Sequence, residues 1–249
     1  CSSDLFLLFG GSGEVIEPFM AALEMIHNYS LVHDDLPAMD NDEYRRGRET
    51  TWKVYGDGMA VLAGDGLLNL AYETAALSFD MAKDTEDIKR AARALKILGR
   101  KAGIYGMIGG QTADLEAESD REISGERLLF IHENKTAALI QAALMIGAVL
   151  AGAGEKEIAA MESAASNIGI AFQIQDDILD VTSTEEVLGK PVGSDERNHK
   201  LTYVSLYGLE KAKKEVKRMS ETALTILSSF ENRNEFLEEL VKMLITREK

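Results

Sequence analysis

Two clusters of aspartates, far apart in an otherwise apolar and helix-patterned chain, are the residues best suited to chemistry. The first is Asp34-Asp35-Leu36-Pro37-Ala38-Met39-Asp40 and the second is Asp176-Asp177-Ile178-Leu179-Asp180. Apolar helix surfaces do not gather three carboxylates for stability, because unpaired buried charge is costly. Two such clusters facing one cavity would bind hard cations, and octahedral magnesium prefers a few carboxylates, water and phosphate oxygens to a closed protein cage. The sequence therefore predicts an enzyme that acts on a diphosphate with magnesium.

The second cluster has the spacing of one helix face. Asp176 and Asp180 are four residues apart, and Asp177 lies about 100° around the helix from Asp176. Gln173, three residues before Asp176, lies on nearly the same face. A carboxylate pair beside an amide suits metal binding and substrate positioning. The alternative for a single motif of this kind is a solvent-facing acidic turn.

The first cluster is longer, so Asp34 and Asp40 would not superpose on an ideal helix. Pro37 has no amide hydrogen, and a kink or bulge there would turn Asp40 toward the other carboxylates. Two adjacent guanidinium groups, Arg45 and Arg46, follow close to the expected end of the same helix. Arginine suits bidentate phosphate recognition, whereas a pair interacting only with the helix dipole is the alternative.

The elements that must position these groups are helices. The chain has 249 residues, 45% of them hydrophobic and only three of them proline, which favours one large helical core. A polar loop is expected at 188–200. We predict a single all-α domain with helices at about 14–46, 51–80, 84–103, 104–119, 124–152, 155–183, 202–228 and 233–247.

Composition excludes several partners. The net charge of −15 argues against nucleic acid or an anionic membrane surface, since both require basic patches. No uninterrupted apolar run reaches the roughly 18–20 residues that span a bilayer, so no stable membrane insertion is expected. Cys1 is the one cysteine, which excludes an intramolecular disulfide and favours a reducing, cytoplasmic location.

Several short motifs together resemble one family. Arg45-Arg46-Gly47 follows the first cluster, Phe172-Gln173 precedes the second, and three further motifs occur in the expected order: Gly109-Gly110-Gln111, Asn134-Lys135-Thr136 and Gly189-Lys190-Pro191. From Leu8 onward the chain resembles the trans-isoprenyl diphosphate synthases, or polyprenyl synthetases. Closest in pattern are the bacterial farnesyl diphosphate synthases, which share the stretch from Glu24 to Asp40 almost continuously.

The resemblance implies an isoprenoid synthase-like fold, a large helical bundle around a deep central cavity. The two motifs would project into that cavity from opposite walls and hold three magnesium ions on an allylic diphosphate. Small, Met- and Ala-rich helices around 60–80 and 137–151 would bury the interface of a homodimer. The implied direct ligands are Asp34, Asp40 and Asp176, supported directly or through waters by Asp35, Asp177 and Asp180.

The resemblance also implies the substrates, isopentenyl diphosphate and an allylic diphosphate such as dimethylallyl or geranyl diphosphate. Ionisation of the allylic C–O bond, attack by the isopentenyl double bond and loss of a proton would join them head-to-tail. Gln173, Thr136 and the Lys135 carbonyl would orient oxygens toward the transient cation, with the released diphosphate as proton acceptor. The implied allylic diphosphate site is Arg45, Lys135 and Lys190, the isopentenyl site includes Arg46 and His27, and Lys200 would close over the cavity.

Product length should depend on the floor of the cavity. The residues four and five positions before Asp34 are Ser30 and Tyr29, and a bulky Tyr29 resembles the class that stops at fifteen carbons. We therefore predict farnesyl diphosphate, with geranylgeranyl diphosphate as the alternative. His33 is interpreted as a packing or hydrogen-bonded residue and not as a catalytic base.

One departure from the family concerns the start of the chain. The family has an earlier Gly-Gly-Lys-x-x-Arg-Pro segment, which does not occur in this sequence. Residues 1–249 are therefore interpreted as a single synthase domain that is N-terminally incomplete. A chain beginning at Cys1 should condense weakly or not at all. Three other kinds of protein share part of this pattern. A non-catalytic synthase subunit would lose its aspartates or lysines, a class I terpene cyclase would carry a different second metal motif, and a structural helical protein would need several motifs to coincide.

Overall fold

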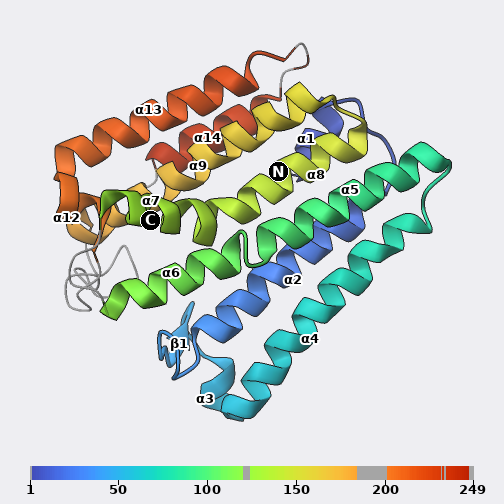
Figure 1. Cartoon of the computed structure of the whole chain (residues 1–249). Helices are drawn as coiled ribbons and strands as arrows, with labels where there is room; N and C mark the ends of the chain where they lie inside the picture. The colour runs from blue at the N-terminus through green and yellow to red at the C-terminus, as the bar shows by residue number, and fades with distance from the viewer. Residues whose placement is uncertain (1, 120–123, 184–200, 231, 233, 247–249) are drawn as a thin grey trace.

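The computed structural model describes residues 2–119, 124–183, 201–230, 232 and 234–246, and the prediction of an all-α bundle is confirmed. The long helices lie side by side as inclined rods (Figure 1). Among the described residues the one sheet is a hairpin of β1 (Tyr44–Arg45) and β2 (Arg48–Glu49). The α-helices are α1 (Ser2–Leu8), α2 (Glu17–Asp34), α3 (Thr51–Tyr55), α4 (Asp57–Ala76), α5 (Thr85–Ala102), α6 (Met107–Ser119), α7 (Gly125–Ile131), α8 (Ala138–Ala151), α9 (Glu155–Thr182), α12 (Tyr203–Tyr207), α13 (Leu209–Leu227) and α14 (Glu235–Thr246).

The helix predicted at 14–46 is wrong beyond Asp34, where α2 ends. The backbone amide of Leu36 donates to the His33 carbonyl at 3.1 Å, so the last turn tightens just before Pro37. A proline shortly after the end of a helix is a common stop signal, because it cannot continue the hydrogen-bonding pattern. The hairpin that follows was not predicted. Its two-residue loop has positive φ at Arg46 (53°) and Gly47 (76°), as a type I′ turn requires.

Two other predicted helices, 51–80 and 202–228, are each broken near their start. In both, a one-turn helix ends at a glycine with positive φ, Gly56 at 86° and Gly208 at 81°, and a long helix begins immediately afterwards. An L side chain would be strained at either position. The long helices after these glycines pack back on the helices that carry the aspartate motifs: α4 on α2, and α13 on α9.

The core is formed mainly by α1, α2, α5, α8 and α9. The continuous helical stretch Gly125–Ala151 is long and apolar enough, by length and composition, to cross a membrane, but 61% of its apolar window is buried inside the bundle. A core helix passes the same test. Ala142 and Ile146 in α8 are fully buried within the chain, and the prediction that 137–151 contributes to a subunit interface stays a prediction.

Candidate active site

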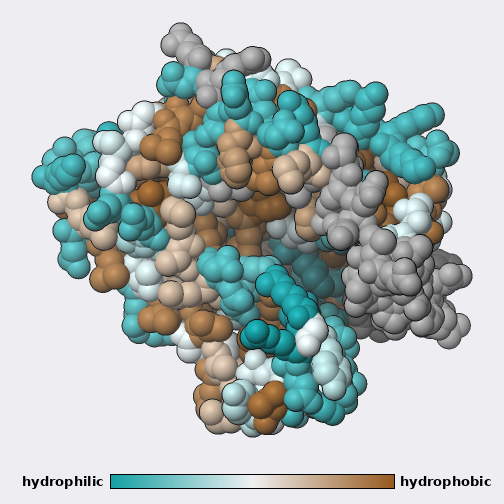
Figure 2. Space-filling view, turned by 180° about the vertical axis from the view of Figure 1, so that it is seen from behind, coloured by the Kyte–Doolittle hydropathy of each residue, from teal (hydrophilic) through white to brown (hydrophobic). Residues whose placement is uncertain are grey.

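A cavity of about 990 Å³ opens between α2, α4, α6 and α8. Asp34, Lys135 and Thr136 contribute polar groups to its lining. Much of the remaining wall is apolar: Met20, Leu23, Leu31, Leu68, Met107, Ile108, Leu115, Leu139, Ile140, Ala143 and Phe172. From the opposite side to Figure 1, a hollow with apolar walls is visible near the centre of the molecule (Figure 2). The combination of a charged group and a long apolar wall suits an amphiphilic substrate.

The first aspartate motif folds back on itself at the C-terminal end of α2. The backbone amide of Asp40 donates to the Asp34 carbonyl at 2.9 Å, and that of Asn41 donates to the Leu36 carbonyl at 3.1 Å. Asn41 has a positive φ of 56°, a conformation that asparagine tolerates better than most residues. The helix therefore ends where a kink was predicted, and the turn that replaces it returns Asp40 beside Asp34.

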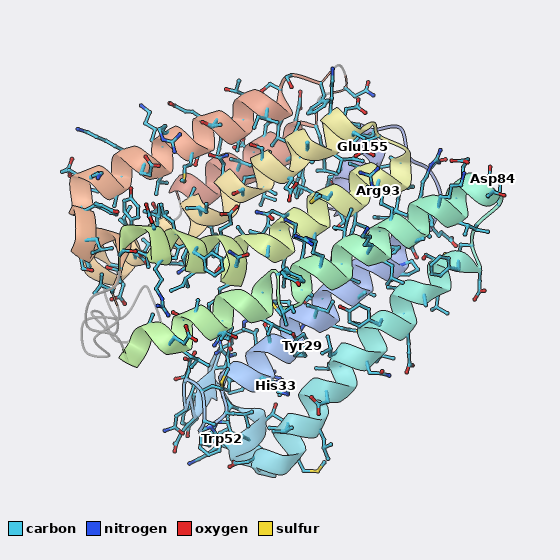
Figure 3. The ribbon with its side chains drawn as sticks, viewed as in Figure 1. Tyr29, His33, Trp52, Asp84, Arg93 and Glu155 are labelled. Atoms are coloured by element: carbon cyan, nitrogen blue, oxygen red, sulfur yellow. The ribbon has the colours of Figure 1, made fainter. Side chains whose placement is uncertain are left out.

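Asp35, in the same motif, forms an ion pair with Arg45. Its Oδ1 accepts from Arg45 Nε at 2.7 Å and lies 2.6 Å from Arg45 Nη2, and the Asp35 side chain is buried. This pair fixes the Arg45 guanidinium against the end of α2. Arg46 is exposed at the tip of the hairpin. The Asp42 carbonyl accepts from the Thr50 hydroxyl and from the Trp52 indole, both at 2.8 Å, which closes the base of this segment (Figure 3).

The carboxylates of the second motif also differ from one another in burial and contacts. The Asp177 carboxylate is buried and accepts from the backbone amide of Tyr203 at 2.7 Å, at the first turn of α12. Asp180 is also buried, whereas Asp176 is partly exposed. Gln173 Oε1 accepts from the hydroxyl of Thr136, a cavity residue, at 2.9 Å. Since Asp176 follows Gln173 by three residues on α9, the two lie on nearly the same face.

Lys135 and Thr136 lie in a π-helical turn, His132–Ala137, within the helix predicted at 124–152. Such turns occur frequently at functional sites. A side chain at Gly110 of α6 would place its Cβ 2.1 Å from the backbone nitrogen of Lys135. A side chain at Gly169 of α9 would place its Cβ 2.3 Å from the Ala137 Cβ. The two glycines therefore allow close packing on this turn. The Gly109-Gly110-Gln111 motif was identified from the sequence, but its packing function was not.

Sequence reasoning missed Asp114. Its Oδ2 lies 2.5 Å from Lys135 Nζ, so α6 holds the one lysine that lines the cavity among the described residues. The signal available was its place three residues after Gln111, on the same helix face. Gln111 itself lines the cavity, and its Nε2 is buried without a hydrogen-bond partner among the described residues.

The electrostatics of the site oppose the ionised form of Asp34. Burial is the largest cause and raises its pKa from 3.8 to about 6, with Asp40 and Asp114 acting in the same direction and Lys135 and Arg45 opposing them. Burial also lowers the pKa of His132, in the π-helical turn, to about 4, so this imidazole is neutral at pH 7. A carboxylate kept in an unfavourable environment is typical of a functional site.

The other predicted residues of α2 also reach the cavity. His27, Tyr29, Ser30 and His33 all contribute to its lining. The Ser30 hydroxyl donates to the His27 carbonyl at 2.9 Å. Tyr29 is buried, and His33 Nε2 lies 3.0 Å from the Val61 carbonyl of α4, which agrees with its interpretation as a packing residue. Lys190 and Lys200 lie outside the described residues.

The donor set agrees with magnesium in kind. The candidate ligands offer only carboxylate oxygens, which magnesium prefers. Within residues 2–119, 124–183 and 201–246, apart from 231 and 233, no group of three or more acidic, histidine or cysteine side chains is close enough to hold a metal ion alone. An ion bound here would therefore need further oxygens, which water and a substrate diphosphate can supply.

Comparison with known proteins identifies the family of this chain. The sequence profile of the family described as polyprenyl synthetase matches residues 6–244. The farnesyl diphosphate synthase of Bacillus subtilis (strain 168) is 44% identical over 231 residues, which cover 93% of this chain and 77% of the relative. The geranylgeranyl diphosphate synthase of Cyanophora paradoxa is 44% identical over 229 residues, or 91% and 74%.

A solved structure agrees with these relatives. The geranyltransferase of Helicobacter pylori, in a crystal structure complexed with magnesium and isoprenyl diphosphate, superposes with a TM-score of 0.80 at 32% identity and covers 98% of this chain and 81% of its own. The family that the sequence motifs resembled is thus confirmed. The chain belongs to the polyprenyl synthetase family of trans-prenyltransferases.

Proposed function

We propose that this protein is a magnesium-dependent farnesyl diphosphate synthase, which joins isopentenyl diphosphate head-to-tail to dimethylallyl and geranyl diphosphates. The observation that carries the proposal is a cavity in which Asp34 and Lys135 lie beside a long apolar wall. This arrangement accepts a diphosphate and a hydrocarbon chain together. The names of the relatives support the substrate class.

In this proposal Asp34, Asp40, Asp176 and Asp180 hold three magnesium ions through oxygen ligands. Bound magnesium would neutralise the negative charge that accumulates on the departing diphosphate. Asp35 and Asp177 have a different contribution, since Asp35 accepts from Arg45 and Asp177 accepts from the Tyr203 amide. They fix the ends of the segments that follow each motif, and so support the metal site indirectly.

The cationic groups then bind the two diphosphates. Lys135 and Arg45 bind the allylic diphosphate, and each is held in place by a carboxylate, Asp114 or Asp35. Arg46 and His27 bind isopentenyl diphosphate. Outside the described residues, Lys190 is assigned to the allylic site and Lys200 to closure of the cavity.

The remaining polar groups stabilise the transient allylic cation. Thr136 donates its hydroxyl hydrogen to Gln173, which leaves the lone pairs of the Thr136 oxygen available for positive charge. The Lys135 carbonyl adds a third oxygen dipole. The apolar wall excludes water that would otherwise trap the cation. The isopentenyl double bond attacks the cation, and the proton lost from the adduct passes to the released diphosphate.

The first test is product analysis with the purified full-length protein, magnesium, isopentenyl diphosphate and each allylic starter. A C15 product that disappears on chelation of magnesium is expected. A C20 product would retain the mechanism and favour geranylgeranyl diphosphate synthase, the second candidate, which the Cyanophora relative supports. Absence of condensation by the full-length protein would favour a non-catalytic subunit, and cyclic hydrocarbons would favour a terpene cyclase.

Product length provides a sharper test at Tyr29, which we assign to the floor of the cavity together with Ser30. Tyr29→Ala should lengthen the main product by at least one isoprene unit, because the lost ring leaves room for further carbons along α2. Chromatography of dephosphorylated products measures the change. Tyr29→Phe is the matched control and should keep the original length, since the Tyr29 hydroxyl has no hydrogen-bond partner among the described residues. An unchanged length in Tyr29→Ala would remove Tyr29 from the floor.

A homodimer is part of this proposal, through the exposed side of α4. Met59, Leu62 and Leu70 are apolar, exposed and spaced by three and eight residues, so they share one side of the helix. Leu62 is 64% exposed, and a group of exposed apolar side chains on one side of a helix is typical of an interaction surface. This half of the interface predicted at 60–80 remains accessible in the single chain.

Leu62→Glu is expected to convert the dimer to monomer, because a carboxylate would be desolvated at the interface. Sedimentation velocity measures the mass. Phe236→Glu, at an exposed apolar residue of α14, is the matched control and should leave the mass unchanged. A dimer that persists in Leu62→Glu would argue against this face.

A further inference from the structure

The orientation of the Tyr29 ring depends on packing and not on hydrogen bonding. The residue is 6% exposed, and its hydroxyl is buried without a partner in the part of the chain that the structure describes. A tyrosine hydroxyl normally has a partner when buried, because leaving it unpaired costs free energy. No hydrogen bond therefore prevents this ring from rotating about its side-chain torsions if a neighbouring group is removed.

The aromatic neighbour of Tyr29 is His33, one helical turn further along α2. The two ring centroids are 5.7 Å apart with an interplanar angle of 81°, an edge-to-face contact. Both side chains lie between α2 and α4 (Figure 3). Both also line the cavity, so a movement of either ring changes its shape.

His33, unlike Tyr29, is fixed on several sides. Its Nε2 lies 3.0 Å from the Val61 carbonyl and 3.9 Å from Asp65 Oδ1, both on α4. The imidazole lies directly over Gly64, where a Cβ would be only 2.0 Å from Nε2. Without a side chain at Gly64, the ring can sit close to the α4 backbone. The imidazole is therefore anchored to α4, whereas the tyrosine it contacts has no such anchor.

We infer that His33 is a specificity-determining residue that sets product length by holding the Tyr29 ring in place. The inference rests on the proposed function, in which Tyr29 forms the floor of the cavity. His33 acts through Tyr29 and not on the reacting atoms. Removing the imidazole would open a gap beside Tyr29, the ring would rotate into that gap, and the growing chain could pass the floor.

The test measures the ratio of the product that is one isoprene unit longer to the wild-type product, together with the rate of the first condensation. His33→Ala should raise that ratio about tenfold or more, within the range by which small changes in an apolar pocket alter specificity. His33→Phe keeps an aromatic ring against Tyr29 and should stay close to the wild-type ratio. Thr74→Val is the matched control, since the Thr74 hydroxyl makes another contact from α4 to α2, with the Met25 sulfur at 3.9 Å, outside the cavity lining.

A double-mutant cycle shows whether His33 acts through Tyr29. In the Tyr29→Ala background, His33→Ala should no longer change the product ratio, because the ring it held is gone. An unchanged ratio in His33→Ala, with every rate lowered alike, would mean a merely structural residue and would overturn the inference. So would additive effects in the double variant. If Tyr29→Ala lengthens the product and His33→Ala does not, the proposed floor stands and only this inference falls; a wild-type protein without condensation activity would overturn both.

Discussion

Asp34→Asn should lower turnover by about 10²–10³-fold or more while making the metal-free protein more stable to heat. Turnover falls because a neutral amide is a weaker ligand for magnesium, so charge on the leaving diphosphate is less well stabilised. Stability rises because the change replaces a carboxylate that the fold disfavours, since burial raises its pKa from 3.8 to about 6. An active-site residue that costs stability is a common trade-off.

The sign of the stability effect follows from proton binding. The folded protein holds the Asp34 proton up to a pH of about 6, whereas the unfolded chain releases it near 3.8, so the free energy of unfolding falls as pH rises between these values. At pH 7 the loss is roughly 1–2 kcal/mol after allowance for partial solvent screening. Asn should therefore raise the melting temperature by about 3–6 °C. Asp80→Asn, at an exposed residue away from the cavity, is the control and should change neither property.

Differential scanning fluorimetry without metal measures the change in melting temperature, and steady-state kinetics measure the change in turnover. Magnesium should also bind more weakly to the wild type below pH 6, by about tenfold per pH unit, because it must displace the Asp34 proton. Full turnover in Asp34→Asn, or in Asp176→Ala, would contradict metal binding by these motifs. A lower melting temperature in Asp34→Asn would contradict the electrostatic argument.

Lys135→Ala should lower kcat/KM for the allylic diphosphate by about 10²–10³-fold. The residue is held 2.5 Å from Asp114 Oδ2 beside the cavity, so it is positioned to bind a diphosphate without a large rearrangement. Alanine also leaves Asp114 without its partner. Lys135→Arg should recover only part of the activity, because the planar guanidinium has a different reach and shape.

Lys101 provides the matched control for Lys135. It is also a half-buried lysine that bridges helices, with contacts to the Gln141 side chain and to Glu162 Oε1 at 2.6 Å, but it does not line the cavity. Lys101→Ala should lower the melting temperature and leave kcat/KM near the wild-type value. Equal losses of activity in the two variants would mean that Lys135 acts through stability alone.

Most of the helices could be predicted from the sequence because their signals are local. The apolar periodicity and the turns at Gly103 and Gly154 place α5, α6 and α9 within a few residues of their observed bounds. The breaks were harder, since Gly56 and Gly208 sit inside otherwise helical patterns, and an isolated glycine there is usually tolerated. A kink was predicted at Pro37, whereas the helix ends at Asp34 and a turn follows.

The candidate site could be predicted in composition but not in its pairings. The motifs identify Asp34, Lys135 and Gln173. Nothing in the local sequence shows that Asp35 would pair with Arg45, or that Asp177 would accept a hydrogen bond from a backbone amide. The sequence did not indicate the π-helical turn for the same reason. It depends on contacts with glycines of two other helices, and such packing is decided by the whole fold.

The glycine junctions at Gly56 and Gly208 have a wider consequence. Each follows a Thr-initiated one-turn helix, and each ends a connection from an aspartate-bearing helix to its packed neighbour, α2 to α4 and α9 to α13. The same local arrangement thus occurs beside both aspartate motifs: a one-turn helix, a glycine with positive φ, and a long helix that packs back on the motif-bearing helix. Because each glycine sets the direction of the helix that follows it, substitutions there could alter the packing behind a motif while every aspartate stays the same.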